Sequence, residues 1–403
     1  MMTYALAAAI ALLALTLFVG ALSPQNRLSL AVVLIFATGA TGQIPSASAY
    51  AFRVAAVIAA VGAALGFLKS PVRAPQASLS RLAAILTAML AVPVFAHREV
   101  SPFLNSLVGT LLLLLVSFAA QRSDTKALVR GFNAGAWGII VLSTPLIAVP
   151  SLGVVGSNFR GITANSNSLG IYCVLAVASA LLLIRVSGLK RIFLIAWPIT
   201  LCVMAHSRTS LIAIALLVAF SAAIKESAGR RLIMAAALAA AVILLIDPAI
   251  MDQLFGGVAN KTTGTRDLSV AEAQRSWETN RLLGLGFDGI HYEVASSPLR
   301  AVAAGGAVML SLYIAAVISM LTTGIRAGSK TFLFACVAVI HSFGEGWMIS
   351  TTGPWILAFS AGLATFAASD NRVRSPLTAP PARVKSSRRR RRAIGAGHVL
   401  NET

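Results

Sequence analysis

An arginine between two apolar segments is the first feature of this chain that could do chemistry. Residues 200–217 read TLCVMAHSRTSLIAIALL, so Arg208 lies in a short polar turn beside hydroxyl-bearing residues and His206. An arginine near a bilayer is costly unless it reaches water or a partner, and its planar fork of donors suits phosphate. The pattern predicts that Arg208 binds an anion. His206 is either a proton carrier near neutral pH or a helix-end residue satisfied locally.

A second polar stretch, residues 156–170, reads GSNFRGITANSNSLG and precedes another apolar segment. Asn165 and Asn167 belong to a group of Asn and Ser residues that can cap the helix that follows. Arg160 stands just before them, and the N-terminus of a helix attracts anions. We therefore expect a capped helix start here, with Arg160 beside it as a further anion-binding residue.

The elements that must position these residues are membrane-spanning helices. Of the 403 residues, 57% are hydrophobic and only 11% are charged, whereas soluble proteins have about 25% charged residues. Apolar stretches long enough to span a bilayer recur along the chain, and they lack the period of two that barrel strands show. We expect an all-α, polytopic transmembrane helical bundle of about 12–13 spans. The spans are predicted near residues 4–22, 28–44, 50–68, 82–96, 103–120, 132–150, 167–185, 192–205, 209–224, 232–248, 301–321, 331–349 and 354–369.

Lysine and arginine are distributed unequally between the connecting loops on the two sides of this bundle. Fifteen lie in one set of loops, whereas the short loops on the other side carry three, namely Arg98, Arg160 and Arg208. Because cytoplasmic loops carry the excess of positive charge, the richer side is predicted to be cytoplasmic. The polar stretches described above then face outward.

The chain divides into a transmembrane domain, residues 1–370, and a basic tail, residues 371–403. One long outward connection, residues 249–300, is inserted into the domain and contains SVAEAQRSWETNRLL, which can form an amphipathic helix. Loops of this length are usually functional or disordered, and a functional loop is favoured. The tail is expected to be disordered and cytoplasmic. Its arginine run, residues 388–392, favours contact with anionic lipids over nucleic acid.

Cationic residues are frequent on the outward face, although the positive-inside rule predicts few of them there. The long connection carries Lys261, Arg266, Arg275, Arg281 and Arg300. A pyrophosphate held at the membrane surface would need several such donors. Lys261, Arg281 and Arg300 are interpreted as residues that solvate the loop, which leaves Arg266 and Arg275 as candidates. The three cysteines lie in apolar runs without CxxC spacing, so neither a disulfide framework nor a metal site is indicated.

Glu345 lies in the stretch HSFGEGWMISTTGPW, inside the predicted span 331–349 and four residues after His341. A carboxylate within a membrane span is a candidate functional group by default. A local pair between Glu345 and His341, one helical turn apart, is the structural alternative.

Taken in order, these stretches resemble the family of O-antigen ligases and O-antigen or exopolysaccharide polymerases. That family shows an arginine-glycine before an Asn-x-Asn-like patch that opens a helix, and this chain has RGITANSNSLG. It next shows a helix ending near Ser-Arg-Thr, here HSRTSLIAI, and then a long periplasmic loop, which in this chain contains TGTRDLSV and NRLLGLGFDGI. The resemblance covers roughly residues 150–325.

The resemblance implies a membrane glycosyltransferase of the bacterial inner membrane that needs no metal or cofactor. Such an enzyme transfers an oligosaccharide, with inversion, from an undecaprenyl-diphosphate donor to an acceptor sugar on the periplasmic face. The resemblance assigns the diphosphate to Arg208 and Arg266, with Arg160 as a third candidate. The expected partners are the lipid-linked oligosaccharide, an acceptor glycan or the lipid A core, membrane lipids and other polysaccharide assembly proteins, but no nucleic acid.

One departure from the family pattern favours a polymerase over a ligase that attaches the chain to lipid A core. Ligases usually carry a His-Asn pair about eleven residues before a glycine at the loop's end, but counting back from Gly306 gives Ala295 and Ser296. The nearby His291 and Glu293 are the candidate catalytic bases, because a base needs only hydrogen-bond reach of the acceptor hydroxyl.

A flippase for lipid-linked oligosaccharides is the alternative from another class. Transporters often show repeated halves and a polar site near the midplane of the membrane. In this chain no internal repeat is visible, and polar groups gather at one face and in one long loop. The glycosyltransferase is therefore the favoured hypothesis.

Overall fold

A computed structural model describes residues 14, 16–40, 46–72, 77–155, 158–223, 263–292, 294–349 and 354–374, and this part of the chain is almost entirely helical. The α-helices are α2 (Pro24–Ala37), α3 (Ser46–Gly66), α4 (Ala77–His97), α5 (Val100–Arg122), α6 (Thr125–Ser143), α7 (Pro150–Gly153), α8 (Ser166–Leu182), α9 (Leu189–Met204), α10 (Arg208–Ala223), α13 (Thr263–Thr279), α14 (Ser297–Ala327), α15 (Ser329–Gly344) and α16 (Pro354–Arg374). Two 3₁₀ turns, η1 (Thr144–Ile147) and η3 (Gly346–Ile349), and a two-stranded antiparallel hairpin, β1 (Val154–Val155) with β2 (Asn158–Phe159), complete the elements.

Each predicted span overlaps a helix wherever the structure describes it, but the ends differ by up to seven residues. The span 132–150 corresponds to α6 (Thr125–Ser143), and the span 331–349 corresponds to α15, which ends at Gly344. Three segments, Ser80–His97, Thr125–Ile147 and Ser297–Ala327, are long and apolar enough to cross a membrane, and several shorter helices are apolar as well. The predicted span 232–248 and most of the span 4–22 lie outside the described residues.

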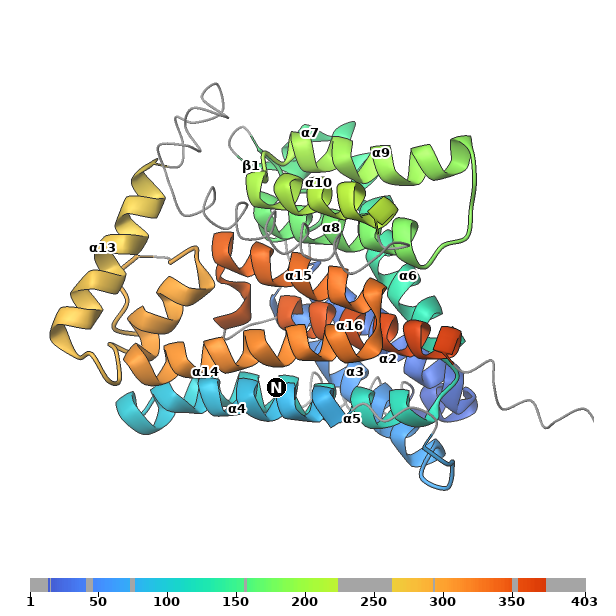
Figure 1. Ribbon diagram of the computed structural model, residues 1–403, viewed down its shortest axis with the longest axis horizontal. Helices are drawn as coiled ribbons and strands as arrows, with labels where there is room; N and C mark the ends of the chain where they lie inside the picture. The colour runs from blue at the N-terminus through green and yellow to red at the C-terminus, as the bar shows by residue number, and fades with distance from the viewer. Residues whose placement is uncertain are drawn as a thin grey trace, which may run out of the picture.

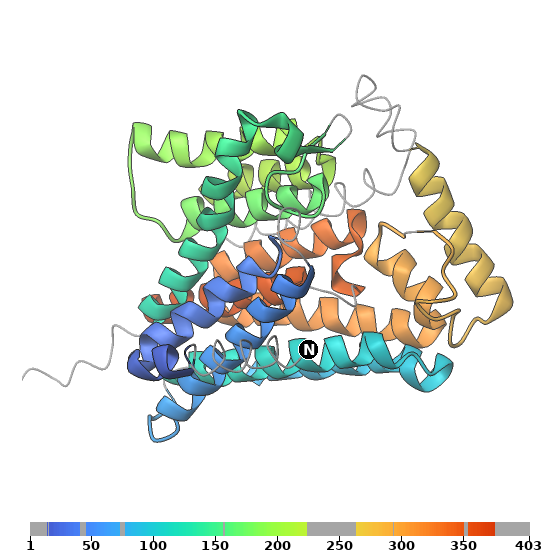
Figure 2. The same cartoon turned by 180° about the vertical axis from the view of Figure 1, so that it is seen from behind.

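Figure 1 shows the helices running roughly side by side along the long axis of the molecule. Helices α8, α9 and α10 form one group, which contacts the central pair α15 and α16 through α10 and α15. Helix α14 packs against α15 on one side and against α4 on the other, and α4 in turn contacts α5. From behind, α2 and α3 cover the remaining face, and α6 crosses obliquely toward the α8 group (Figure 2).

Glycines let α2 and α6 pack closely at the back of this bundle. A Cβ added at Gly131 would lie 2.7 Å from the carbonyl oxygen of Ser29, and one at Gly135 would lie 2.7 Å from the ring of Phe36. Small residues are typical of helix contacts in membranes, where close backbone approach replaces the hydrophobic drive. Phe36 meets Phe132 edge to face, with ring centroids 5.4 Å apart, so aromatic rings fill the space between these helices.

The two ends of the bundle differ in composition. We call the "basic end" the one where α2 and α6 begin and α14 and α16 end. There Arg27 donates to the carbonyls of Val19 and Gly62, at 2.9 and 3.0 Å, and Asp370 accepts from the backbone N–H of Thr331 at 2.9 Å. We call the opposite end, where α8, α10 and α14 begin and α15 ends, the "loop end"; α13 lies across this end (Figure 1).

Helix α14 is broken near its start at Gly305 and Gly306, and Gly306 has a φ of +59° that suits glycine. A break inside an apolar helix would leave backbone groups without partners, which is costly where water is absent. Here the segment 281–286 supplies the missing partners. Backbone bonds of 2.8–3.2 Å run from Leu285 and Gly286 to Ala303 and Ala304, and from Ala307 and Val308 to Arg281 and Leu282.

The predicted helix in the long connection is present as α13, but its buried face is not apolar. The residues buried on one side of α13 are Ser269, Glu272, Ala273 and Ser276. Trp277, by contrast, is 39% exposed. The serines on this face can hydrogen-bond to the backbone packed against the helix. Ser276 Oγ donates to the carbonyl of Ala303 in α14 at 2.9 Å. Polar contacts therefore hold α13 in place.

Candidate functional site

The polar stretch before α8 forms the helix cap that its sequence predicts. Asn165 has extended backbone angles, and its side-chain oxygen accepts from the Ser168 backbone N–H at 2.8 Å. This satisfies one of the donors that a helix start leaves unpaired. Asn167, one residue into the helix, points its amide elsewhere and donates to Oε2 of Glu345 at 3.3 Å. The cap thus positions the Asn167 amide so that it reaches the carboxylate that follows α15.

Arg208 is the first residue of α10, after a turn of three residues that follows α9. In that turn His206 adopts a φ of +53°, is exposed, and places Nδ1 3.1 Å from the carbonyl of Met204. This is the locally satisfied histidine that the sequence left open as an alternative. The turn directs Arg208 to the loop end of the bundle, and its side chain is half-buried there.

Small residues and hydroxyls bring α8 and α10 into direct contact beside Arg208. Ser207 and Ser210 are buried and hydrogen-bonded to each other, with their oxygens 2.8 Å apart. A Cβ added at Gly170 of α8 would overlap both hydroxyls. The two polar stretches of the sequence, residues 156–170 and 206–210, are therefore neighbours in the fold.

The end of α15 meets the same place. Helix α15 stops at Gly344, which lies so close to Thr209 that a Cβ at this position would overlap the threonine side chain. Glu345 follows with an extended backbone, φ −139° and ψ 138°. The expectation that Glu345 lies within a helical span is therefore wrong, because the helix ends one residue earlier at the loop end.

The first turn of α14 anchors the backbone around Glu345. The Ser297 hydroxyl, which is fully buried, donates to the carbonyl of Glu345 at 2.7 Å and accepts from the Met348 N–H at 3.2 Å. The Arg300 guanidinium donates to the carbonyl of Gly346 at 3.4 Å. Arg300 was interpreted from sequence as a loop-solvating residue, but it is half-buried and braces the chain after α15.

We call this meeting point the "four-helix junction" and define it by one or two residues from each helix. Its members are Asn167 of α8, Arg208 and Thr209 of α10, Arg300 of α14, and Glu345 after α15. The Asn167 amide binds the Glu345 carboxylate there, and the same elements carry the guanidinium groups of Arg208 and Arg300. Such a set can bind an anion through the arginines and accept a proton through the carboxylate.

His341 lies beneath the junction and does not pair with Glu345 in the way the local alternative supposed. Its ring is fully buried, and Nε2 lies 2.9 Å from the hydroxyl of Ser210, which belongs to α10. A chain of hydrogen bonds thus runs from Ser207 through Ser210 to His341. It ties α15 to α10 just below Arg208.

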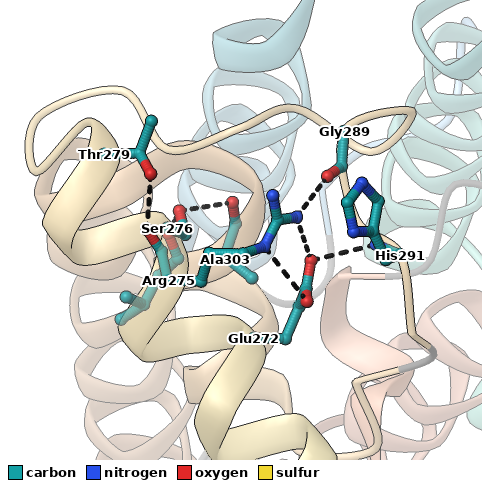
Figure 3. A network of polar contacts seen from close by, with 8 residues as sticks. Glu272, Arg275, Ser276, Thr279, Gly289, His291 and Ala303 are labelled. Carbon is teal, nitrogen blue, oxygen red and sulfur yellow. Dashed lines mark hydrogen bonds and ion pairs between the residues drawn. The ribbon is translucent and has the colours of Figure 1, made fainter.

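The other charged cluster at the loop end belongs to α13. Figure 3 shows the Glu272 carboxylate between the Arg275 guanidinium and the backbone N–H of His291, which donates to it at 2.9 Å. Arg275 also donates to the carbonyl of Gly289 at 2.7 Å. We call this group the "α13 cluster". Its contacts close the loop after α13 onto the helix.

The charges of the α13 cluster satisfy one another. The hydrogen bond from Arg275, with a smaller contribution from the His291 N–H, holds the pKa of the Glu272 carboxyl below its usual value, although burial acts in the opposite direction. The same pairing raises the pKa of Arg275. Glu272 is 3% exposed and Arg275 39% exposed, so the carboxylate is the buried partner. The arrangement is that of a structural ion pair.

Of the two predicted catalytic bases, the structure describes only His291. The His291 side chain is exposed, and the hydrogen bond that this residue makes in the α13 cluster comes from its backbone. Glu293 lies outside the described residues. Arg266 lies in the first turn of α13, and its side chain is also outside the described part of the chain.

Arg160 follows β2, and its backbone closes the loop before α8. Its N–H donates to the carbonyl of Gly153 at 2.8 Å, and its own carbonyl accepts from the Thr163 hydroxyl at 2.7 Å. The side chain is half-buried. The loop that carries Arg160 therefore runs directly into the Asn165 cap.

Sequence reasoning missed the contributions of Ser297, Arg300 and Ser210 to this region. A serine and an arginine in the first turn of a helix after a long loop gave a weak signal, since such residues commonly solvate helix ends. Ser210 lies only two residues from Arg208, but nothing local indicates that it faces His341, 131 residues away.

No protein-family model and no curated protein sequence matches this chain.

Proposed function

We propose that this chain is a polytopic glycosyltransferase of the bacterial inner membrane. It transfers an oligosaccharide from an undecaprenyl-diphosphate donor to an acceptor sugar on the periplasmic side, and it acts as a polymerase of O antigen or exopolysaccharide. The observation that carries the proposal is the convergence at one end of the bundle of two stretches that resemble the polymerase and ligase family. Gly170 of the first packs against Ser207 of the second.

The membrane orientation follows from the charge of the two ends. The helix ends at the basic end carry Arg122, Lys126, Arg130, Arg326 and Lys330. Because positive loops stay in the cytoplasm, the loop end faces the periplasm, where the lipid-linked donor is presented. The four-helix junction then lies near the periplasmic surface of the inner membrane, within reach of a diphosphate at the headgroup level.

Arg208 is the residue assigned to the diphosphate, with Arg266 and Arg160 as further donors. When the bond between the sugar and the diphosphate breaks, negative charge develops on the leaving oxygen. A guanidinium already held at that position stabilises this charge without reorganisation, and such fixed electrostatics are often the largest catalytic contribution. The buried Ser207 and Ser210 hydroxyls, which bind each other and, through Ser210, His341, hold the start of α10 in place.

Purified protein in proteoliposomes tests the proposal directly. A synthetic polyprenyl-diphosphate oligosaccharide is supplied as donor and a second repeat unit as acceptor. The expected result is a longer glycan together with free polyprenyl diphosphate, without added metal. Transport of the lipid-linked oligosaccharide across the bilayer, with no new glycosidic bond, would identify a flippase and overturn the proposal.

A gene deletion distinguishes the polymerase from the ligase. A polymerase deletion leaves single repeat units on the lipid A core, or removes a secreted polymer while lipopolysaccharide stays normal. A ligase deletion removes every repeat unit from the core. We expect the first pattern, because Ala295 and Ser296 occupy the positions where ligases carry the His-Asn pair, whereas His291 and Glu293 lie a few residues earlier.

Orientation is tested by labelling single cysteines from outside the cell. Ala271, exposed on α13, and Ser187, exposed in the turn between α8 and α9, lie at opposite ends of the bundle. We expect Ala271→Cys to react with a membrane-impermeant thiol reagent and Ser187→Cys to stay unlabelled. Labelling of Ser187→Cys alone would place the junction in the cytoplasm and remove the periplasmic site.

A further inference from the structure

Glu345 lies where side chains of α14 bind the backbone of the four-helix junction. It lies between two helical elements, α15 and η3, in extended conformation. The Ser297 hydroxyl binds its carbonyl at 2.7 Å, and Arg300 binds the next carbonyl, that of Gly346, at 3.4 Å. A Cβ at Gly346 would lie 2.9 Å from Nη1 of Arg300, so this glycine allows the close approach.

The side chain of Glu345 is directed by a residue from another helix. Asn167 donates its amide to Oε2 at 3.3 Å, and Asn167 is itself placed by the capped start of α8. On the other side, Gly344 packs against Thr209, the residue after Arg208. The Glu345 carboxylate is thus bound from α8, and the backbone just before it packs against α10 next to Arg208, the residue assigned to the diphosphate.

Two other glutamates in the described part of the chain, Glu99 and Glu272, have different tasks. Glu99 accepts from the N–H groups of Phe287 and Asp288, at 3.0 and 2.8 Å, and so holds the loop after α13. Glu272 is bound by Arg275 and the His291 N–H. Each binds backbone N–H groups and closes a turn, whereas Glu345 meets a side-chain amide at a junction of four helices.

We propose that Glu345 is the general base that activates the acceptor sugar, an inference that rests on the proposed function. The acceptor hydroxyl gives its proton to the Glu345 carboxylate as its oxygen bonds to the anomeric carbon of the donor. The bond between that carbon and the diphosphate oxygen breaks, and its electron pair stays on the diphosphate. Asn167 and Ser297 are positioning residues, which aim the carboxylate and fix its backbone.

The test uses the full-length protein in proteoliposomes with the synthetic donor and acceptor. Glu345→Gln keeps the shape of the side chain but cannot accept the proton. We expect it to bind the donor with unchanged affinity and to lower kcat by about 100- to 10,000-fold, the usual contribution of a general base. Glu278→Gln is the matched control, since Glu278 is exposed on α13 and its carboxylate is bound by Gln274.

Chemical rescue separates a base from a structural carboxylate. Glu345→Ala removes the side chain, and added formate should restore part of the rate if the missing group is a proton acceptor. Two results would overturn the inference, namely normal turnover by Glu345→Gln, or a loss in Glu345→Ala that formate does not restore although the melting temperature is unchanged. An inactive wild-type protein would instead overturn the proposed function itself.

Discussion

The four-helix junction and the α13 cluster both place arginine and glutamate at the loop end, but they are built from different lengths of chain. The residues of the α13 cluster lie within residues 272–291, and their contacts close one helix onto the loop that follows it. The junction draws on helices as distant as α8 and the end of α15, and its Asn167–Glu345 bond spans 178 residues. A local cluster can fold a loop, whereas the junction exists only when the whole bundle is assembled.

This difference separates two kinds of arginine that look alike in the sequence. Arg275 binds Glu272 three residues away and the Gly289 carbonyl, so its charge serves the loop. Arg208 starts a helix among small residues and hydroxyls that bring three helices together. We therefore expect substitutions in the two groups to affect different quantities, namely catalysis at the junction and stability in the α13 cluster.

Substituting Arg208 should have the largest effect. Arg208→Ala removes the donors assigned to the diphosphate, and we expect turnover to fall by about 100- to 1000-fold, as when a fixed donor to a developing charge is lost. Arg208→Lys keeps the charge but not the planar fork, so it should also be severely impaired. Polymer length on a gel, in a deletion strain with matched levels of each variant, measures the effect. Normal polymer from Arg208→Ala would show that Arg208 does not bind the donor and only extends into the solvent at the membrane surface.

Enlarging Gly170 should disturb the junction without removing any charge. The new methyl group in Gly170→Ala would overlap the Ser207 and Ser210 hydroxyls and force α8 away from α10. Overpacking of this kind costs about 1–3 kcal/mol, so we expect a lower melting temperature and reduced polymer. Gly138→Ala is the matched control, because nothing lies within 4 Å of the position of its new Cβ. Equal behaviour of the two variants would contradict the close contact of the helices.

Substituting Arg275 should affect the loop more than the chemistry. Arg275→Ala leaves the buried Glu272 carboxylate without its guanidinium partner and frees the Gly289 carbonyl. We expect faster proteolytic cleavage between residues 280 and 292, with donor binding retained. A variant that keeps its loop protected but loses donor binding would move Arg275 into the binding site and remove the distinction between the two clusters.

Acid should loosen the α13 cluster by a smaller amount. Arg275 holds the pKa of the Glu272 carboxyl below its usual value of 4.5. The interaction between the two side chains therefore stabilises the folded loop fully when the pH is above 4.5. This contribution is lost as the pH falls through the lower, folded-state pKa. Hydrogen exchange of the His291 N–H, corrected for the intrinsic rate, should therefore quicken in acid. Glu272→Gln should remove most of this pH dependence, and an unchanged profile in that variant would assign it to another group.

The positions of the helices could be predicted from the sequence because apolar runs and caps are local signals. The run after Asn165 and the short turn before Arg208 each gave a helix start within one or two residues of the observed one. The composition of the α13 face was not predictable, because its serines are buried by hydrogen bonds to α14 and to the loop after α13. In sequence, a helix that is held by polar contacts shows the same pattern of polar residues as a helix that is exposed to water.

The centre of the candidate site was only partly predictable. Arg208 and Glu345 were identified as charged residues in apolar surroundings and Asn167 as part of a helix cap, but the bond between Asn167 and Glu345 depends on the packing of α8 beside the end of α15. No spacing in a single sequence encodes such a pair. The break at Gly305 and Gly306 was missed for a similar reason, since two glycines in an apolar run fit either a continuous helix or a broken one.

The broken start of α14 limits how the site can open. The segment 281–286 completes the hydrogen bonding of that helix through four backbone bonds. Pulling it away would leave paired groups exposed in an apolar setting, at a cost of several kcal/mol for each group. The segment is therefore fixed to the broken start of α14, and we do not expect it to swing away as a lid.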